Sequence, residues 1–337
     1  MKYHCVLNKS IKIFIKWFVG PLLTIWLFYS LYQQVRQQPD LKTAIALISS
    51  APFGAAAWKF WLVIILVFVN WGIEALKWQL LMRNVESLSF FRAFKSVLSG
   101  VTMSINTPNR IGEYAGRVLF IKEGYRLQAV SLSIAGGMAQ LIITMVMGCI
   151  GLAYLIWGMN LQSGAIGISD FWLTLFLYGS IFCTIGFVFF FFRLSWLIRL
   201  IEKIPRADRL VKYINVLEAF DAKILLRLLA LSLFRYIVFV LQYIFMLQLM
   251  QVEQHFATGF WTITVLFWIM AVIPSFAIAE LGIRGTVAKT LFAYSHNTVG
   301  ILAVTFGTWF VNLFIPALIG SLLILGIKTK KENDKEC

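Results

Sequence analysis

Residues 171–192 read FWLTLFLYGSIFCTIGFVFFFF, a run without a single charged side chain. As an α-helix, a run of this length spans about 33 Å, which matches the ~30 Å hydrocarbon core of a bilayer. Similar apolar runs occupy residues 60–76, 127–157 and 301–327. Of the 337 residues, 60% are hydrophobic and 13% charged, whereas soluble domains have about 25% charged residues. The sequence predicts an all-α polytopic integral membrane protein and excludes a soluble fold.

The first apolar run, residues 13–31, follows a lysine-rich N-terminus as a signal peptide would. It is longer than the ~7–15 residues of a signal-peptide core, and no A-x-A-like cleavage site follows it. We therefore expect a retained helix, the first of about six full transmembrane helices. These helices are expected at about 13–32, 60–81, 127–157, 171–193, 228–250 and 297–327.

Lysine and arginine are unevenly distributed along a chain whose net charge is +15. The loops at 158–170 and 251–259 contain neither residue, so the positive-inside rule places them outside and both termini in the cytoplasm, at the plasma membrane. The positive charge is expected to meet anionic lipid headgroups rather than nucleic acid. We expect one transmembrane domain over residues 1–327, with a basic amphipathic cytoplasmic segment at 195–225 and a basic cytoplasmic tail at 328–337.

Two segments, 88–124 and 258–295, are too polar to be ordinary spans and too apolar to be loops. Each places a proline between an apolar and a polar stretch, Pro108 in the first and Pro274 in the second. We interpret both as proline-broken re-entrant hairpins that enter the membrane from opposite faces. Non-helical backbone at that depth must be buried in protein or line a cavity.

The two prolines are 166 residues apart, and the helices that flank them are offset by nearly the same distance. A unit of helix, broken hairpin and helix is therefore predicted twice, at about 60–157 and 228–327. The first copy starts outside and the second inside, so the repeat is inverted. Inverted repeats with broken helices are typical of secondary transporters.

The first hairpin contains the sequence NTPNRIGEYAGR, residues 106–117. Asn106 or Thr107 can cap a helix, and Pro108 suits the first helical position. A half-helix that starts at this depth offers free N–H groups and a positive dipole end to a phosphate. Asn106 and Pro108 are therefore candidate substrate-binding residues.

Charged residues follow at helical spacing in the first hairpin and recur in the second. Arg110, Glu113 and Arg117 are expected on one helical face, where two arginines can bind a phosphate and the glutamate can orient an arginine. In the second hairpin Glu280 and Arg284 are four residues apart, as in a helical ion pair. The alternative is that these arginines only extend to the headgroups and that the pairs are structural.

Weaker candidates lie in the helices at 60–81 and 127–157. Asn70, Glu74 and Lys77 are spaced to share a face, which either lines a cavity or pairs charges near the cytoplasmic end. Gly136 and Gln140 indicate either close helix packing or a substrate contact.

The motifs PNRIGE, residues 108–113, and ELGIR, residues 280–284, resemble the flippase-like transmembrane domain of lysylphosphatidylglycerol synthases. The similarity covers about residues 13–327, although the family more often has its glutamate after the G-x-R of the second motif. The resemblance implies a lipid-translocating module with Arg110, Glu113, Arg117, Glu280 and Arg284 in its site. It also implies that this chain transfers no aminoacyl group, because the family's soluble transferase domain does not follow.

The expected function is transport of a membrane phospholipid or a polyprenyl-phosphate lipid between leaflets. No paired acid–base residues, metal-ligand spacing or P-loop motif is found, so no catalysis, metal or cofactor is expected. The alternatives are a transferase that acts on lipid-linked sugars and a membrane subunit of a lipid-modifying pathway. A second copy of the chain or a lipid-modifying enzyme is the further partner considered.

Overall fold

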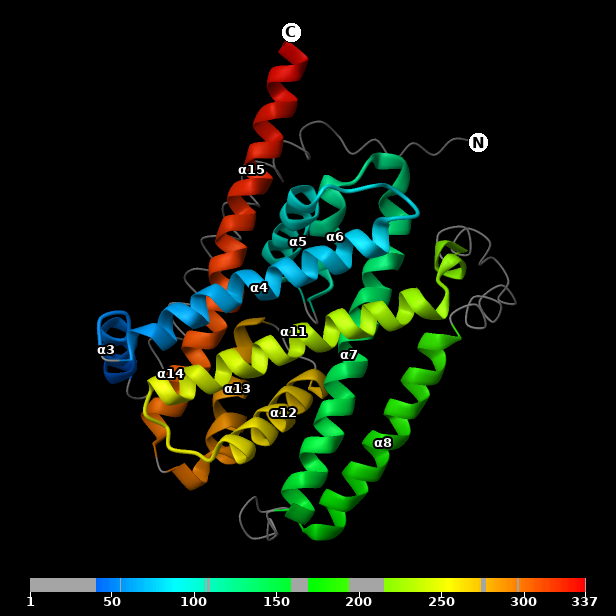
Figure 1. Cartoon of the computed structure of the whole chain (residues 1–337). Coiled ribbons are helices and arrows are strands. Elements are labelled where there is room, and N and C mark those ends of the chain that lie inside the picture. The colour runs from blue at the N-terminus through cyan, green and yellow to red at the C-terminus, as the bar shows by residue number, and fades with distance from the viewer. Residues whose placement is uncertain are drawn as a thin grey trace. The chain divides into compact units, whose positions relative to one another are not determined.

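Every regular element is a helix in the part of the chain that the computed structural model describes, residues 41–54, 56–105, 107, 110–158, 169–193, 215–273, 277–295 and 297–336 (Figure 1). This confirms the all-α prediction. Residues 43–337 form one compact unit. The α-helices are α3 (Leu41–Ser50), α4 (Ala57–Met82), α5 (Phe90–Ser104), α6 (Gly112–Arg117), α7 (Arg126–Ala153), α8 (Asp170–Phe192), α11 (Ala222–Leu249), α12 (Phe256–Val272), α13 (Ala277–Leu291), α14 (Thr298–Trp309) and α15 (Ile315–Glu336).

Within the described residues, five helical segments are long and apolar enough to cross a bilayer, which confirms a polytopic membrane protein. They are Ala57–Met82, Glu123–Gly158, Phe171–Phe192, Ala222–Leu249 and Thr298–Gly326. Large apolar side chains remain on their outer faces: in α8, Phe182 is 80% exposed and Phe171 69%. Surface of this kind is unfavourable in water and favourable against lipid. The span predicted at 13–32 lies outside the described residues.

Two helix boundaries differ from the predicted ones. α11 begins at Ala222 rather than near 228, because the Asp221 side chain caps it and accepts a hydrogen bond from Ile224 N at 2.9 Å. α15 continues to Glu336, so the predicted tail extends a helix. Most of the predicted amphipathic segment, at 194–214, lies outside the described residues.

The helices α4 and α11 lie side by side and run antiparallel (Figure 1). Gln242 Nε2 donates to Val63 O at 3.2 Å, and Arg235 Nε donates to Asn70 Oδ1 at 2.9 Å. Moving seven residues forward along α4 therefore means moving seven residues back along α11. This register brings polar groups of both helices together at mid-length, where neither helix end can supply a partner.

Glycines set the packing of the first predicted hairpin. A Cβ atom at Gly112 or Gly116 of α6 would collide with the carbonyl oxygen of Met103 or Ser99 in α5. Ser96 Oγ donates to Arg117 O at 2.7 Å, which joins the other ends of the two helices. Close backbone approach at small residues is a common packing mode between membrane helices.

The chain is also interrupted at the second predicted hairpin, between α12 and α13. Pro108 and Pro274 both lie outside the described residues. α12 packs against α7, where Gly148 accommodates Trp268 and Gly151 accommodates Thr264. Separate helices thus precede and follow each of the two proline segments, and the entry of these segments into the membrane from opposite faces stays a prediction.

Candidate functional site

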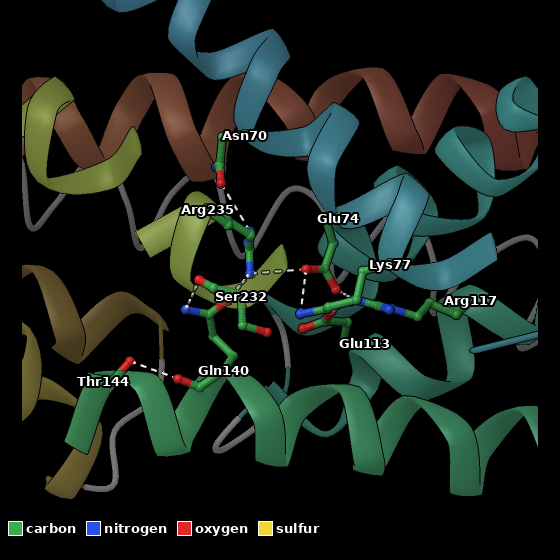
Figure 2. Close-up of polar contacts among 9 residues, drawn as sticks. All are labelled: Asn70, Glu74, Lys77, Glu113, Arg117, Gln140, Thr144, Ser232 and Arg235. Carbon is green, nitrogen blue, oxygen red and sulfur yellow. Dashed lines mark hydrogen bonds and ion pairs between the residues drawn. The ribbon is translucent and has the colours of Figure 1, made fainter. Parts of the chain in front are cut away.

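Glu74 of α4 is the centre of a buried charge cluster (Figure 2). Its carboxylate lies 2.8 Å from Lys77 Nζ, 2.7 Å from an Arg117 guanidinium nitrogen and 3.2 Å from Arg235 Nη1. These partners come from α4, α6 and α11. One carboxylate therefore links the first long helix, the first hairpin and the helix that opens the second half of the chain.

A second carboxylate completes the cluster. Glu113 forms an ion pair with Arg117 one helical turn away in α6, and its side chain is 28% exposed. The cluster then contains three cations and two anions. Because an uncompensated buried charge costs several kcal/mol (about 3–5 when one partner is removed), each of these groups depends on the others.

Aromatic rings and amides position the two arginines. The Arg117 guanidinium lies 5.3 Å from the centre of the Trp78 ring, and that of Arg235 lies 5.2 Å from both Trp71 and Phe239. Arginine is well suited to such faces because its planar cation is weakly hydrated. Both guanidinium groups are thereby held at defined positions among apolar helices.

Polar side chains of α4 and α7 complete the environment of Arg235. Asn70 Oδ1 accepts from Nε, and Gln140 Oε1 accepts from Nη1 at 3.4 Å. Gln140 Nε2 donates to Ser232 O at 3.5 Å, while Thr144 Oγ1 donates to Gln140 O at 3.0 Å (Figure 2). The amides are arranged as acceptors toward the arginine, which fixes its orientation.

The charge cluster forms one wall of a cavity of about 620 Å³. Its lining comes from α4, α5, α6, α7, α11, α12, α13 and α14 and from the π-helical segment η8 (Phe310–Phe314). Apolar and aromatic side chains, among them Phe239, Phe267 and Met270, form much of the remainder. A cavity of this size can enclose a small polar molecule or a lipid headgroup. Its charged lining residues are Lys77, Arg110, Arg117, Arg235, Arg284, Glu74 and Glu113.

The structure brings four of the seven predicted binding residues to this cavity. Arg110, Glu113 and Arg117 reach it from the first hairpin and Arg284 from the second. Asn106 and Pro108 lie outside the described residues. Glu280 falls in α13, but its side chain is outside them too. The residue pattern thus identified one shared cavity from two segments more than 160 residues apart.

Arg110 reaches the cavity by a different route from the one predicted. It precedes α6, with φ at 57°, a left-handed conformation that is uncommon for residues other than glycine. Arg110 therefore does not share a helical face with Glu113 and Arg117; that expectation is wrong. The reason is that the tight packing of Gly112 against α5 delays the start of the helix until after the turn.

The amino end of α6 is not organised as predicted either. The cap position of α6 is Ile111, which makes no side-chain cap bond; Thr107 Oγ1, five residues before Gly112, accepts a hydrogen bond from Gly112 N at 2.7 Å and so occupies this N–H group. α6 has only six residues, too few for a substantial dipole. The predicted phosphate contact from the amino end of this helix is therefore not available at Gly112 N, and the cationic groups of the cavity are its guanidinium and ammonium groups.

Arg235 is the main site residue that sequence reasoning missed. A usable signal exists: it is a cation well inside the apolar run Ala222–Leu249, where charge is expensive and usually functional. Glu74 and Lys77 both line the cavity, as does Gln140, and they also pair with each other, so the two interpretations of these residues hold together. Within the described residues, no three His, Cys, Asp or Glu side chains gather as a metal site would require.

The fold and the site together define a class of protein: a polytopic helical membrane protein with a charged cavity among its spans. The chain belongs to the family of the lysylphosphatidylglycerol synthase transmembrane region, whose model matches residues 17–320. This confirms the resemblance seen in the two motifs and makes the chain a lipid-related multi-pass membrane protein. No curated protein matches the chain.

Proposed function

We propose that the chain is a lipid transporter that moves a phosphate-bearing lipid between the two leaflets. The observation that carries this proposal is the cavity itself, in which five basic side chains lie among helices of membrane-spanning length. Arg110, Arg117 and Arg284 bind the headgroup phosphate, because guanidinium groups donate paired hydrogen bonds to its oxygens. The acyl or prenyl chains stay in the lipid.

The physical need for such a cavity follows from the cost of desolvation. An ionised phosphate loses strong hydration when it leaves water, so it crosses an unaided bilayer very slowly. Fixed cations inside the protein replace that hydration. Before a lipid binds, the carboxylates of Glu74 and Glu113 offset part of the positive charge of the cavity. When a phosphate binds Arg117, it replaces these carboxylates as the partner of that guanidinium group.

Two features support an inverted repeat over about 60–157 and 228–327 with hairpins that enter from opposite faces. The helices that open the two units, α4 and α11, are antiparallel neighbours. In addition, Arg117 and Arg284 reach one cavity from the two hairpins. This arrangement allows the cavity to open alternately to either leaflet, with both chain termini on the cytoplasmic side.

The test is headgroup exchange in proteoliposomes, read by bleaching of a fluorescent lipid in the outer leaflet. Wild type is expected to exchange an anionic phospholipid or a polyprenyl phosphate, and Arg110→Ala is expected to lose that exchange. Arg83→Ala is the matched control, because Arg83 is exposed at the end of α4 and is not among the lining residues. If wild type exchanges none of these lipids, a subunit or transferase role in lipid modification replaces the proposal.

A further inference from the structure

Six neutral polar side chains of the cavity wall each have one buried polar atom without a hydrogen-bond partner among the described residues. None of the six is more than 7% exposed. All six line the cavity, and they come from α4, α7, α11, α14 and η8. The atoms are Ser133 Oγ, Tyr236 OH, Thr308 Oγ1, Asn312 Oδ1, Trp71 Nε1 and Trp309 Nε1.

Such a concentration is unusual, because the great majority of buried polar atoms in proteins have partners. A buried polar atom without a partner is destabilising, so a wall of them indicates that a polar molecule supplies the missing bonds. The six groups are all neutral. Hydroxyls both donate and accept, the indoles donate, and the amide oxygen accepts, which together complement hydroxyl groups of a ligand.

Local contacts hold two of these groups in place. Asn312 Nδ2 donates to Thr308 O at 3.1 Å, so the atom without a partner is Oδ1, at the other end of its amide. Asn312 lies within the π-helical segment η8, a distortion that often occurs at functional sites. The Tyr236 ring packs edge-on against Phe267, with centroids 5.9 Å apart. These positions are therefore preorganised.

The charged side chains of the cavity further restrict which headgroups it can bind. Among the described residues, the two acidic side chains that line it, Glu74 and Glu113, are ion-paired to Arg117. An ammonium group would have to displace an arginine from a carboxylate while it faces five basic side chains. Like-charge contacts of this kind are a strong means of rejecting a ligand.

We infer that the cavity selects an anionic headgroup that carries free hydroxyls beyond its phosphate, and that it rejects aminoacylated, cationic headgroups. The inference rests on the proposed function only in that the cavity holds a lipid headgroup. Arginines bind the phosphate, and the neutral wall binds the hydroxyls. Two lipid classes supply this chemistry: a phospholipid with a glycerol headgroup, and a polyprenyl phosphate that carries a sugar.

The binding test uses two lipids of equal charge. Purified full-length protein is offered equal amounts of phosphatidylglycerol and phosphatidylpropanol, which differ by two hydroxyls, and the retained lipid is quantified by native mass spectrometry. A preference of about tenfold or more for phosphatidylglycerol is expected, because a site built for hydroxyls rejects the analogue without them. Lysylphosphatidylglycerol is expected to be retained least.

A parallel competition offers a mannosyl polyprenyl phosphate against the propyl ester of the same polyprenyl phosphate, a phosphodiester of equal charge that lacks the sugar hydroxyls. A stronger hydroxyl preference in this pair than in the phospholipid pair identifies the sugar-bearing lipid as the source of the ligand. Equal retention within both pairs shows that the neutral wall binds water only, and this result overturns the inference.

Variants separate hydroxyl recognition from phosphate binding. Two substitutions keep the side-chain shape and remove a hydroxyl: Tyr236→Phe and Thr308→Val. Each is expected to reduce the preference for phosphatidylglycerol over phosphatidylpropanol until the two lipids are retained almost equally, while the amount of phosphatidylpropanol retained does not change. Tyr178→Phe is the matched control on the exposed side of α8 and should keep the preference. An unchanged preference in both cavity variants contradicts the inference. A hydroxyl preference without leaflet exchange supports the inference and defeats the transport proposal.

Discussion

Arg117 of α6 places a guanidinium nitrogen 2.7 Å from Oε1 of Glu74 in α4, and both side chains are buried. This contact joins the first hairpin to the first long helix of the described chain. Glu74 also pairs with Arg235 of α11. The same carboxylate therefore links the hairpin to both long helices, and any group that competes for Arg117 loosens that link.

The first prediction concerns the charge of Glu74. In Glu74→Gln, Lys77, Arg117 and Arg235 lose their shared anion, so the folded state is expected to lose about 3–5 kcal/mol. Thermal unfolding of the purified protein in detergent measures this as a lower Tm. Glu123→Gln is the control, since the Glu123 side chain is 79% exposed and its substitution should leave Tm unchanged. Equal Tm values for the two variants would show that the buried cluster is not a stabilising unit.

The second prediction concerns the close approach of α5 and α6. In Gly116→Ala the new Cβ meets backbone atoms of Ser99 and Gly100, which cannot move aside as a flexible side chain would. Overpacking of this kind costs about 1–3 kcal/mol, and it displaces Arg117 next to it in sequence. Both Tm and lipid exchange should fall. Gly124→Ala introduces the same methyl group into open space and should change neither.

The third prediction separates stability from function at Arg110. Because φ of Arg110 is 57°, glycine there relieves a strain of about 1 kcal/mol, while the guanidinium group is lost from the cavity. Arg110→Gly should be at least as stable as Arg110→Ala by Tm, and both should lack lipid exchange. Gln251→Gly is the matched control, at φ 54° and away from the cavity. Normal exchange in Arg110→Gly would remove Arg110 from the proposed site.

The fourth prediction tests whether the second hairpin contributes to the site. Arg284→Ala removes a lining guanidinium group, and a charge-assisted contact to phosphate is worth about 1.5–3 kcal/mol, so exchange should fall by about tenfold or more. Lys289→Ala removes an exposed cation of the same helix and should leave exchange near the wild-type rate. If the two variants behave alike, the site is confined to the first hairpin.

Membrane spans and helix interruptions could be predicted from local sequence because their causes are local. The apolar run at 171–192 is favourable in lipid whatever surrounds it, and a proline such as Pro108 or Pro274 disfavours a continuous helix through its own segment. The sequence also singled out four side chains that line the cavity, because charge in a largely apolar segment is conspicuous. They are Arg110, Glu113, Arg117 and Arg284.

Local sequence could not predict which polar side chains form hydrogen bonds or ion pairs with each other. Asn70 and Arg235 are 165 residues apart in sequence, and Glu74 and Arg117 are 43 apart. Nothing local to either residue of a pair indicates the other. The turn that carries Arg110 likewise depends on how closely Gly112 approaches α5, which is a property of the packed hairpin.

The sequence by itself determined that this chain crosses a membrane as helices and that two interrupted segments carry charge, because transfer free energy and backbone preferences act on neighbouring residues. Only the tertiary structure decided that one carboxylate is shared by three cations and that six neutral polar groups meet in the same cavity. Those relationships depend on the antiparallel register of α4 and α11 and on the glycine contacts of α5 with α6. Register and close packing are set by side chains that meet only after the chain has folded.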